Sequence, residues 1–334
     1  MITILRITTV FLLLALFFSC AVADREPESS SDQAVNGELY REMAKIMEYY
    51  NMAVNRSYTG SQEEFSRDFG AVLQDFDNKY NSNLYNDYRE RLSEYTITRS
   101  GSDESAAYPV LTDLPVSVDG AVYVSGGKYD MTSAAIDTIS PFATNAHYFH
   151  AGALDLDKHD PTNLEAMSIQ SGGGKGAYYE SVYAWSRTAN VAVLNPKLQF
   201  SQAQLDQAQA YMDHYCKPEN TGMSYGFFQN TVNFFNPVTK EDNYYWYCTK
   251  VVWRIYQQLG YDIDSNTDKI DWSNSSLYTM SKAYFYARYF YSPSTAESEM
   301  NKLMQHLKTT LILAEEVYFS PDFTLVYEAI RDPF

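Results

Sequence analysis

Cys248 is the residue of this chain that is best placed to act as a nucleophile. It follows an aromatic, strand-like run, Tyr244–Tyr247, and opens a segment whose apolar side chains recur with helical spacing. That segment ends at Gly260, where a left-handed C-cap is expected, so Cys248 falls on the first turn of a helix. Free N–H groups and the helix dipole favour a thiolate at such an end. The alternative is a cysteine buried only as a small hydrophobic residue.

Two polar residues on neighbouring predicted strands could serve this cysteine. Alternation over residues 148–156 places His150 on the core side of its strand. In the next predicted strand Glu165 alternates with apolar residues, so its carboxylate faces inward and needs a partner. These residues are a base and its orienting group for Cys248, or a hydrogen-bonded pair inside the sheet, depending on the register between the strands. His147 falls on the opposite face and is the weaker candidate base.

Composition limits the classes of partner. The chain has 334 residues, enough for one large domain or one domain with an extension, and 45% of them are hydrophobic. A net charge of −17 argues against nucleic acid or an anionic membrane surface as the partner. Aromatic residues reach 16%, with 30 tyrosines, which suits a carbohydrate or peptide groove and equally a well-packed core. We therefore expect a globular protein that acts on a small or peptide-like partner.

The N-terminus is typical of an export signal. Arg6 supplies a positive charge, and residues 7–18 form an apolar stretch that is short for a bilayer span. Cleavage after Ala23 gives a signal peptide of residues 1–23 and a linker of residues 24–38. Alternatively, Cys20 is the lipidated residue of a loose lipobox, and the linker is then a flexible tether. Either ending predicts an exported protein, which is periplasmic, secreted or an outer-membrane lipoprotein.

The remaining polar motifs have simpler explanations. Cys216 and Cys248 could form a disulfide, which would exclude a catalytic Cys248. His214 and Cys216 lack a complementary pair at metal-ligand spacing, so no metal site is predicted and the two residues are expected to close a helix. The glycine-rich segment 171–176 lacks the Gly-Lys-Ser/Thr ending of a phosphate-binding loop and is expected to be a flexible loop.

The hydrophobic pattern predicts an α+β protein with an antiparallel sheet. Residues 39–98 read as three amphipathic helices that must bury their apolar sides against the following domain, and 98–107 as a polar linker. Strands are expected at 121–124, 148–156, 164–169, 191–194 and 323–327, and further helices at 202–215, 277–291 and 296–316. Strands flanked by helices at both ends suggest this fold class.

The order of these pieces resembles one protein family. A His-bearing strand precedes a Glu-bearing strand and then a Cys-bearing helix, which reverses the usual papain order. This is similar to the circularly permuted NlpC-type papain-like proteins of the YiiX/YebB-like branch, over residues 108–334. The segments that carry the resemblance are Asp119-Gly120-Ala121-Val122, Phe149-His150-Ala151-Gly152, Leu164-Glu165-Ala166, the 202–215 helix, Ser224-Tyr225-Gly226-Phe227 and Tyr247-Cys248-Thr249-Lys250-Val251-Val252.

The resemblance implies a role for each matching residue. Cys248 is then the nucleophile, His150 the general base and Glu165 the residue that orients His150, with Tyr247 and Tyr225 in contact with substrate. No cofactor or metal is implied. The chain departs from the family at two places: Thr249-Lys250 follows the cysteine where Ser-Glu is frequent, and Gly226 stands where Asp is frequent.

The sequence thus predicts an exported cysteine amidase or peptidase with a helical extension, and cell-wall peptides are the substrate that family analogy suggests. One alternative is an acyltransferase or lipid-ester hydrolase that resembles lecithin:retinol acyltransferase relatives. The other is a surface lipoprotein that binds peptide or glycan without catalysis. A Cys216–Cys248 disulfide, or a Cys248 enclosed by the helices of residues 39–98, would favour the non-catalytic alternative.

Overall fold

The computed structural model describes residues 30–54, 58–97, 108–115, 119–127, 131–154, 165–169, 177–181, 185–216, 224–225, 239–243, 245–289 and 292–332. The predicted signal segment with Cys20, the 98–107 linker and the glycine-rich segment 171–176 lie outside these residues. Residues 1–39 and 40–334 are two separate compact units, and the second contains the elements discussed below. Helix α2 (Ser30–Val54) begins at Ser30, so residues 30–38 are helical where a linker was expected.

A mixed α+β fold with an antiparallel sheet is confirmed. Six strands lie in the order β4-β3-β2-β1-β5-β8, and every neighbouring pair is antiparallel. The strands are β1 (Val122–Gly126), β2 (Tyr148–Leu154), β3 (Glu165–Ile169), β4 (Ala177–Ser181), β5 (Asn190–Pro196) and β8 (Phe323–Ile330). All five predicted strands are present, and β4 is an addition that the sequence pattern did not indicate.

The centre of the sheet is buried on both faces. Every residue of β1 is buried, as are the first five residues of β5. One face carries a core cluster in which Tyr123, Val191 and Val193 pack with Trp185. Continuous apolar runs of this kind are typical of strands covered on both sides. β1 and β5 therefore form the rigid centre beside which β2 carries His150.

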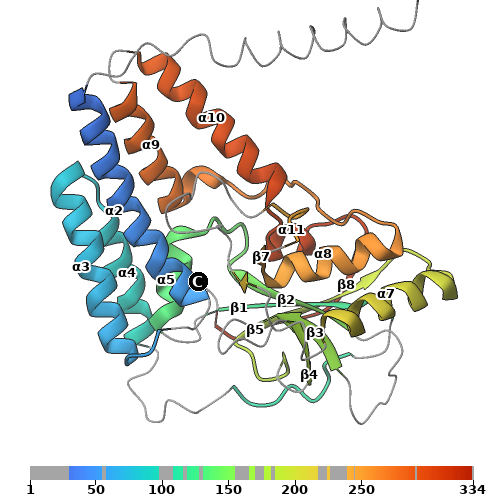
Figure 1. The fold of residues 1–334 in the computed structure, drawn as a ribbon. Coiled ribbons are helices and arrows are strands. Elements are labelled where there is room, and N and C mark those ends of the chain that lie inside the picture. Colours follow the sequence, from blue (N-terminus) through green and yellow to red (C-terminus); the bar gives the residue numbers. More distant parts are fainter. Residues whose placement is uncertain are drawn as a thin grey trace, which may run out of the picture. The chain divides into compact units, whose positions relative to one another are not determined.

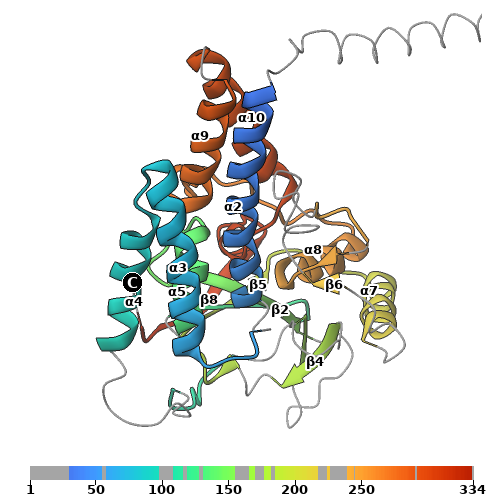
Figure 2. The ribbon, with the colours of Figure 1, turned by 60° about the vertical axis from the view of Figure 1, so that its left-hand side comes forward.

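Helices near the N-terminus lie side by side at one end of the sheet (Figures 1 and 2). Helices α3 (Gln62–Tyr80) and α4 (Leu84–Ile97) match the predicted periodicity, and α3 opens with the expected Ser61–Glu64 capping box. Both pack on α5 (Met131–Ile139), a helix that the sequence pattern did not indicate. The predicted helices thus bury their apolar sides against the following domain, as expected, and share one compact unit with the sheet.

The second half of the chain packs partly on the sheet and partly on the N-terminal helices. Helix α7 (Gln202–Tyr215) packs on α8 (Cys248–Leu259), and α8 packs on β2 and β3. The remaining elements are β6 (Ser224–Tyr225), β7 (Tyr245–Trp246), the short 3₁₀ helix η2 (Trp272–Asn274), α9 (Ser276–Arg288), α10 (Pro293–Thr310) and α11 (Ala314–Tyr318). Within the described part of the chain, none of the helices is both long and apolar enough to cross a membrane.

Candidate active site

Cys248 is the first residue of α8, as the sequence predicted. Tyr247 is the N-cap residue, and Gly260 ends the helix in the left-handed conformation with φ of 88°. The apolar side of the helix is buried, which holds its axis against the sheet. Cys248 itself is only 1% exposed. The thiol therefore lies at the end of the helix where N–H groups lack helical partners, and it is shielded from solvent.

The residues on either side of Cys248, Tyr247 and Thr249, both form hydrogen bonds with the backbone of Ile312. The hydroxyl of Tyr247 accepts a hydrogen bond from the N–H of Ile312 at 3.1 Å. The hydroxyl of Thr249 donates to the carbonyl oxygen of Ile312 at 2.6 Å. All three residues are buried, so these bonds form in a medium of low dielectric constant. They fix the first turn of α8 on either side of the thiol.

A β-bulge precedes His150 on β2. Ser125 of β1 pairs with His150, but the next residue, Gly126, pairs with Tyr148, so Phe149 is an extra residue on β2. A bulge bends its strand and redirects the side chains beside it. The bulge explains how a histidine of a sheet strand reaches a thiol on a helix that packs against that strand.

The side chains of Cys248 and His150 form a hydrogen-bonded pair. Burial is the largest single influence on the pKa of the Cys248 thiol and raises it, whereas the hydrogen bond and the charge of the His150 side chain lower it. Hydrogen bonds from the backbone N–H groups of Ala151 and Thr249 act in the same direction. The resulting pKa lies below the ordinary value, so the sulfur is an activated nucleophile. Its Sγ also lies 3.6 Å from the carbonyl oxygen of Phe149.

Trp185 is the residue that the structure places against His150. The two rings stack with centroids 4.9 Å apart and planes 8° from parallel, and Trp185 is buried. A flat aromatic surface limits the rotation of the imidazole. Trp185 stands alone between two strands, with no periodic pattern around it, so sequence analysis had no signal that would assign it to the site.

The register of the sheet does not bring Glu165 to His150. Ala153 pairs with Met167 and Leu154 with Ala166, so Glu165 lies beyond the Leu154 end of the pair. His150 precedes Leu154 by four residues, about 14 Å along a strand. Paired residues share a face, which assigns position 165 to the face opposite that of His150. The interaction described at the site is therefore the one between Cys248 and His150, and the role of Glu165 stays a prediction. The side chain of Glu165 is outside the described part of the structure.

Helix α2 contributes Tyr50 to the surroundings of the thiol. Tyr50 is 5% exposed, and its hydroxyl lies 2.6 Å from Oγ of Ser140, which follows α5. Burial raises the pKa of Tyr50 to about 12, with a further contribution from the nearby charge of Cys248. A residue from the predicted helical extension thus lies close enough to Cys248 to interact with its charge. Neither Tyr50 nor Ser140 stood out in the sequence.

The other predicted residues have clear positions. Tyr247 is fully buried and its hydroxyl accepts from the N–H of Ile312, and its contact with substrate stays a prediction. The backbone of Tyr225 pairs with Trp246, two residues before Cys248, while its side chain is not among those described. Cys216 is the C-cap residue of α7, and neither it nor Cys248 is part of a disulfide. The disulfide that would have excluded catalysis is not formed.

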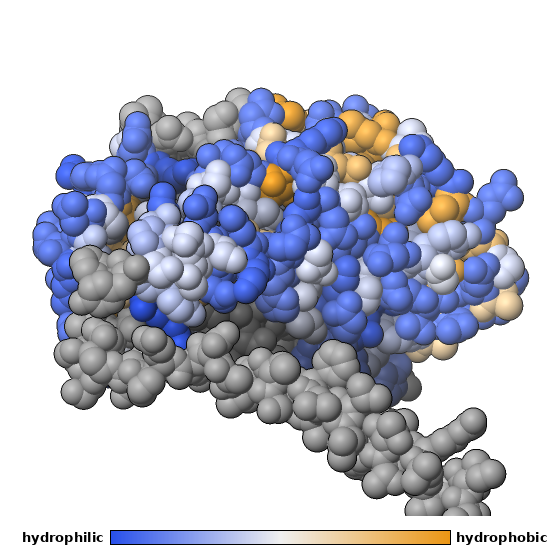
Figure 3. Space-filling view, turned by 90° about the horizontal axis from the view of Figure 1, so that it is seen from above, coloured by the Kyte–Doolittle hydropathy of each residue, from blue (hydrophilic) through white to orange (hydrophobic). Residues whose placement is uncertain are grey.

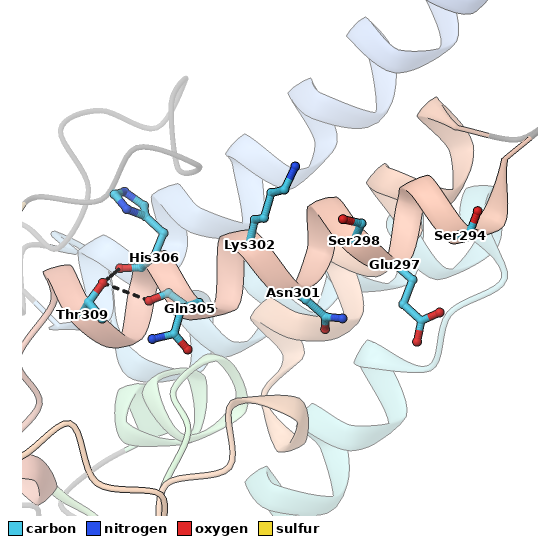
Figure 4. A pocket seen from close by; sticks show the side chains of 8 residues that line it. All are labelled: Ser294, Glu297, Ser298, Asn301, Lys302, Gln305, His306 and Thr309. Atoms are coloured by element: carbon cyan, nitrogen blue, oxygen red, sulfur yellow. Dashed lines mark hydrogen bonds between the residues drawn. The ribbon is translucent and has the colours of Figure 1, made fainter. Parts of the chain in front are cut away.

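A hollow of about 830 Å³ lies open along α10 (Figure 4). Its lining side chains belong to that helix and are polar, and Thr309 donates to the carbonyl oxygens of Gln305 and His306. No interaction there pairs a nucleophile with a base. In the face drawn in Figure 3, hydrophilic residues predominate and hydrophobic ones form small separate patches. We therefore place the candidate site at Cys248.

Among the described residues, no group of three or more His, Cys, Asp or Glu side chains is arranged to hold a metal ion.

Comparison with known proteins gives a fold neighbour. No protein-family model and no curated protein matches the sequence. Among solved structures, the chain is similar to the metalloprotein YiiX from Escherichia coli O157:H7, DUF1105. The TM-score is 0.39, with 18% identity over 64% of this chain and 99% of that one. We argue nothing about activity from this neighbour, and the permuted papain-like assignment stays a prediction.

Proposed function

We propose that the protein is a thiol hydrolase in which Cys248 is the nucleophile and His150 its general base. The observation that carries this proposal is the hydrogen-bonded Cys248–His150 pair at the N-terminus of α8, with a thiol pKa below its ordinary value. A thiolate at this position attacks carbonyl carbon readily, because the imidazole holds the proton that the thiol has lost.

The steps of the proposed hydrolysis follow from the Cys248–His150 pair. His150 takes the thiol proton, and the sulfur of Cys248 forms a bond to the carbonyl carbon of an amide or ester. The imidazolium returns its proton to the leaving amine or alcohol as the bond to it breaks, which leaves a thioester on Cys248. Water, deprotonated by His150, then hydrolyses the thioester. The N–H groups of Ala151 and Thr249, which bond the sulfur in the resting site, are the donors nearest to the developing negative charge.

The substrate class we propose is a peptide or related amide outside the cytoplasm, such as a cell-wall peptide. Two features of the sequence support it: the export-type N-terminus, and the net charge of −17, which disfavours nucleic acid and anionic membrane surfaces as partners. Lipidation of Cys20, in the alternative ending of the leader, would place the enzyme on a membrane without changing the reaction.

Burial of the thiol favours one competing function. Cys248 is 1% exposed, which suits a binding protein whose cysteine serves only packing. Catalysis therefore requires that the residues that bury Cys248 move apart to admit substrate, as lids do in many enzymes.

Trapping an acyl-enzyme decides between the two functions. The protein is mixed with p-nitrophenyl acetate, and its intact mass and peptide masses are recorded against time. We expect a burst of p-nitrophenol with an acetyl thioester on Cys248, which hydroxylamine removes, and loss of the burst in Cys248→Ala. The matched control is Cys216→Ala, which should keep the burst. Acetylation of Cys216 and Cys248 at equal rates, or no acetylation of Cys248, would reject the hydrolase.

A further inference from the structure

A second histidine, His147, immediately precedes β2 and contacts side chains of the helical part of the fold. Its Nδ1 lies 2.5 Å from Oδ1 of Asp137 on α5. Its ring stacks on Phe142 with centroids 4.5 Å apart and planes 7° from parallel. Asp137 is 4% exposed, and its second carboxylate oxygen accepts from the guanidinium of Arg91 on α4. One buried carboxylate thus joins α4, α5 and the start of β2.

The backbone of His147 is held in an uncommon conformation. Its φ of 44° lies in the left-handed region, which a residue with a side chain adopts only where its surroundings compel it. The strand on the other side reinforces this constraint, because a Cβ on Gly126 would lie 2.0 Å from the carbonyl oxygen of His147. The Asp137 bond, the Phe142 stack and the close approach of Gly126 therefore fix His147 together.

A second carboxylate holds the segment before His147. Glu315 of α11 accepts from the N–H of Thr144 at 3.1 Å and from its hydroxyl at 2.5 Å, and also from the N–H of Ala143. The charge of His147 acts on Glu315 as well. The charged groups that face this histidine are thus Asp137 with its partner Arg91 on one side and Glu315 on the other.

This arrangement has a consequence for the catalytic pair. His147 precedes His150 by three residues, and the bulged residue Phe149, whose carbonyl oxygen touches Cys248, lies between them. We propose that Asp137 and His147 are positioning residues that set the bulge of β2 and thereby the place of His150 beside Cys248. The inference rests on the proposed function, because it gives the helices of residues 62–139 a role in activating the thiol.

The test compares two disruptive variants, Asp137→Asn and His147→Ala, with the conservative variant His147→Asn. Asp137→Asn removes the charge that holds His147, and His147→Ala removes both the bond and a side chain that tolerates positive φ. His147→Asn keeps a donor for Asp137 and a residue that favours the left-handed region. The rate of Cys248 alkylation by iodoacetamide is measured against pH. We expect Asp137→Asn and His147→Ala to lower the rate at pH 6 about tenfold, a displacement of the thiol pKa by about one unit, and His147→Asn to restore it.

A second measurement reads the position of His150 without relying on the thiol. The ring ¹⁵N signals of His150, identified by their loss in His150→Ala, should move in Asp137→Asn and return in His147→Asn. The control is Asp87→Asn on α4, where the carboxylate bonds only Asn83 at the surface. Unchanged His150 signals and an unchanged alkylation profile in Asp137→Asn would overturn the inference. An ordinary thiol in the unmutated protein with moving His150 signals would instead reject the hydrolase and keep the positioning role.

Discussion

The carbonyl oxygen of Phe149 lies 3.6 Å from Sγ of Cys248, so the residue next to His150 contacts the proposed nucleophile directly. This contact joins the bulge of β2 to the first turn of α8. Cys248 is buried and its side chain is short, so the first turn of α8 holds Sγ close to this carbonyl group. The following predictions test the parts of this arrangement separately.

Thr249→Val should destabilise the protein by about 1–3 kcal/mol, since it leaves the buried carbonyl oxygen of Ile312 without its hydroxyl donor. The free energy of unfolding, measured with urea, checks this. Thr138→Val is the matched control, because the carbonyl that Thr138 bonds belongs to Ala134 within the same helix and keeps a backbone partner. Equal effects of the two changes would contradict the role assigned to Thr249.

Tyr50→Ala should expose the thiol. We expect N-ethylmaleimide to label Cys248 faster in this variant, with the pH midpoint of labelling unchanged, because a large buried ring near Cys248 is gone while His150 stays in place. Tyr50→Phe keeps the ring and should label slowly. Tyr49→Ala is the control on the same helix, since Tyr49 packs on Phe65 and Phe69 of α3. If Tyr49→Ala accelerated labelling as much as Tyr50→Ala, general loosening of α2 would be the cause.

Lys250 should make stability depend on pH. Burial lowers its pKa to about 7, although the charge of Asp242 opposes that effect. Between about pH 7 and the ordinary lysine value of about 10.5 the unfolded chain binds the extra proton. Stability relative to Lys250→Met should therefore rise with pH in this window, at about 1.4 kcal/mol per pH unit, and stay level below pH 7.

Urea unfolding between pH 6 and pH 9 measures this difference. Lys302→Met on α10 is the control, because that side chain is 70% exposed and its loss should leave the slope unchanged. A difference between the protein and Lys250→Met that stays constant over this range would show that Lys250 keeps its proton when buried.

Sequence periodicity was sufficient to predict features that depend only on residues close together in the sequence. The start of α8 at Cys248, its end at Gly260 and the 202–215 helix follow from capping residues and apolar spacing, and all three are confirmed. The alternation along β2 likewise identified His150 as the inward-facing histidine that meets the thiol. Each of these features is encoded within about a dozen residues.

Features that depend on distant residues could not be predicted in the same way. The register between β2 and β3 depends on the connection between them, and a shift of one residue exchanges the faces of a strand. This is why the sequence could not fix the position of Glu165 relative to His150. Trp185, Tyr50 and Asp137 reach the site from other parts of the chain, and α5 has a short stripe of small residues that resembles a loop or strand as much as a helix.

The alkylation rate of Cys248 against pH, in the protein and in His150→Ala, tests the central claim most directly. Iodoacetamide labelling is followed by peptide mass spectrometry, and Cys216 of the same chain serves as the ordinary thiol. We predict a midpoint for Cys248 well below about 8.5, the usual cysteine value, which moves up to or beyond that value in His150→Ala while Cys216 is unaffected. A Cys248 midpoint at or above that of Cys216, unchanged by His150→Ala in a folded variant, would contradict an activated pair.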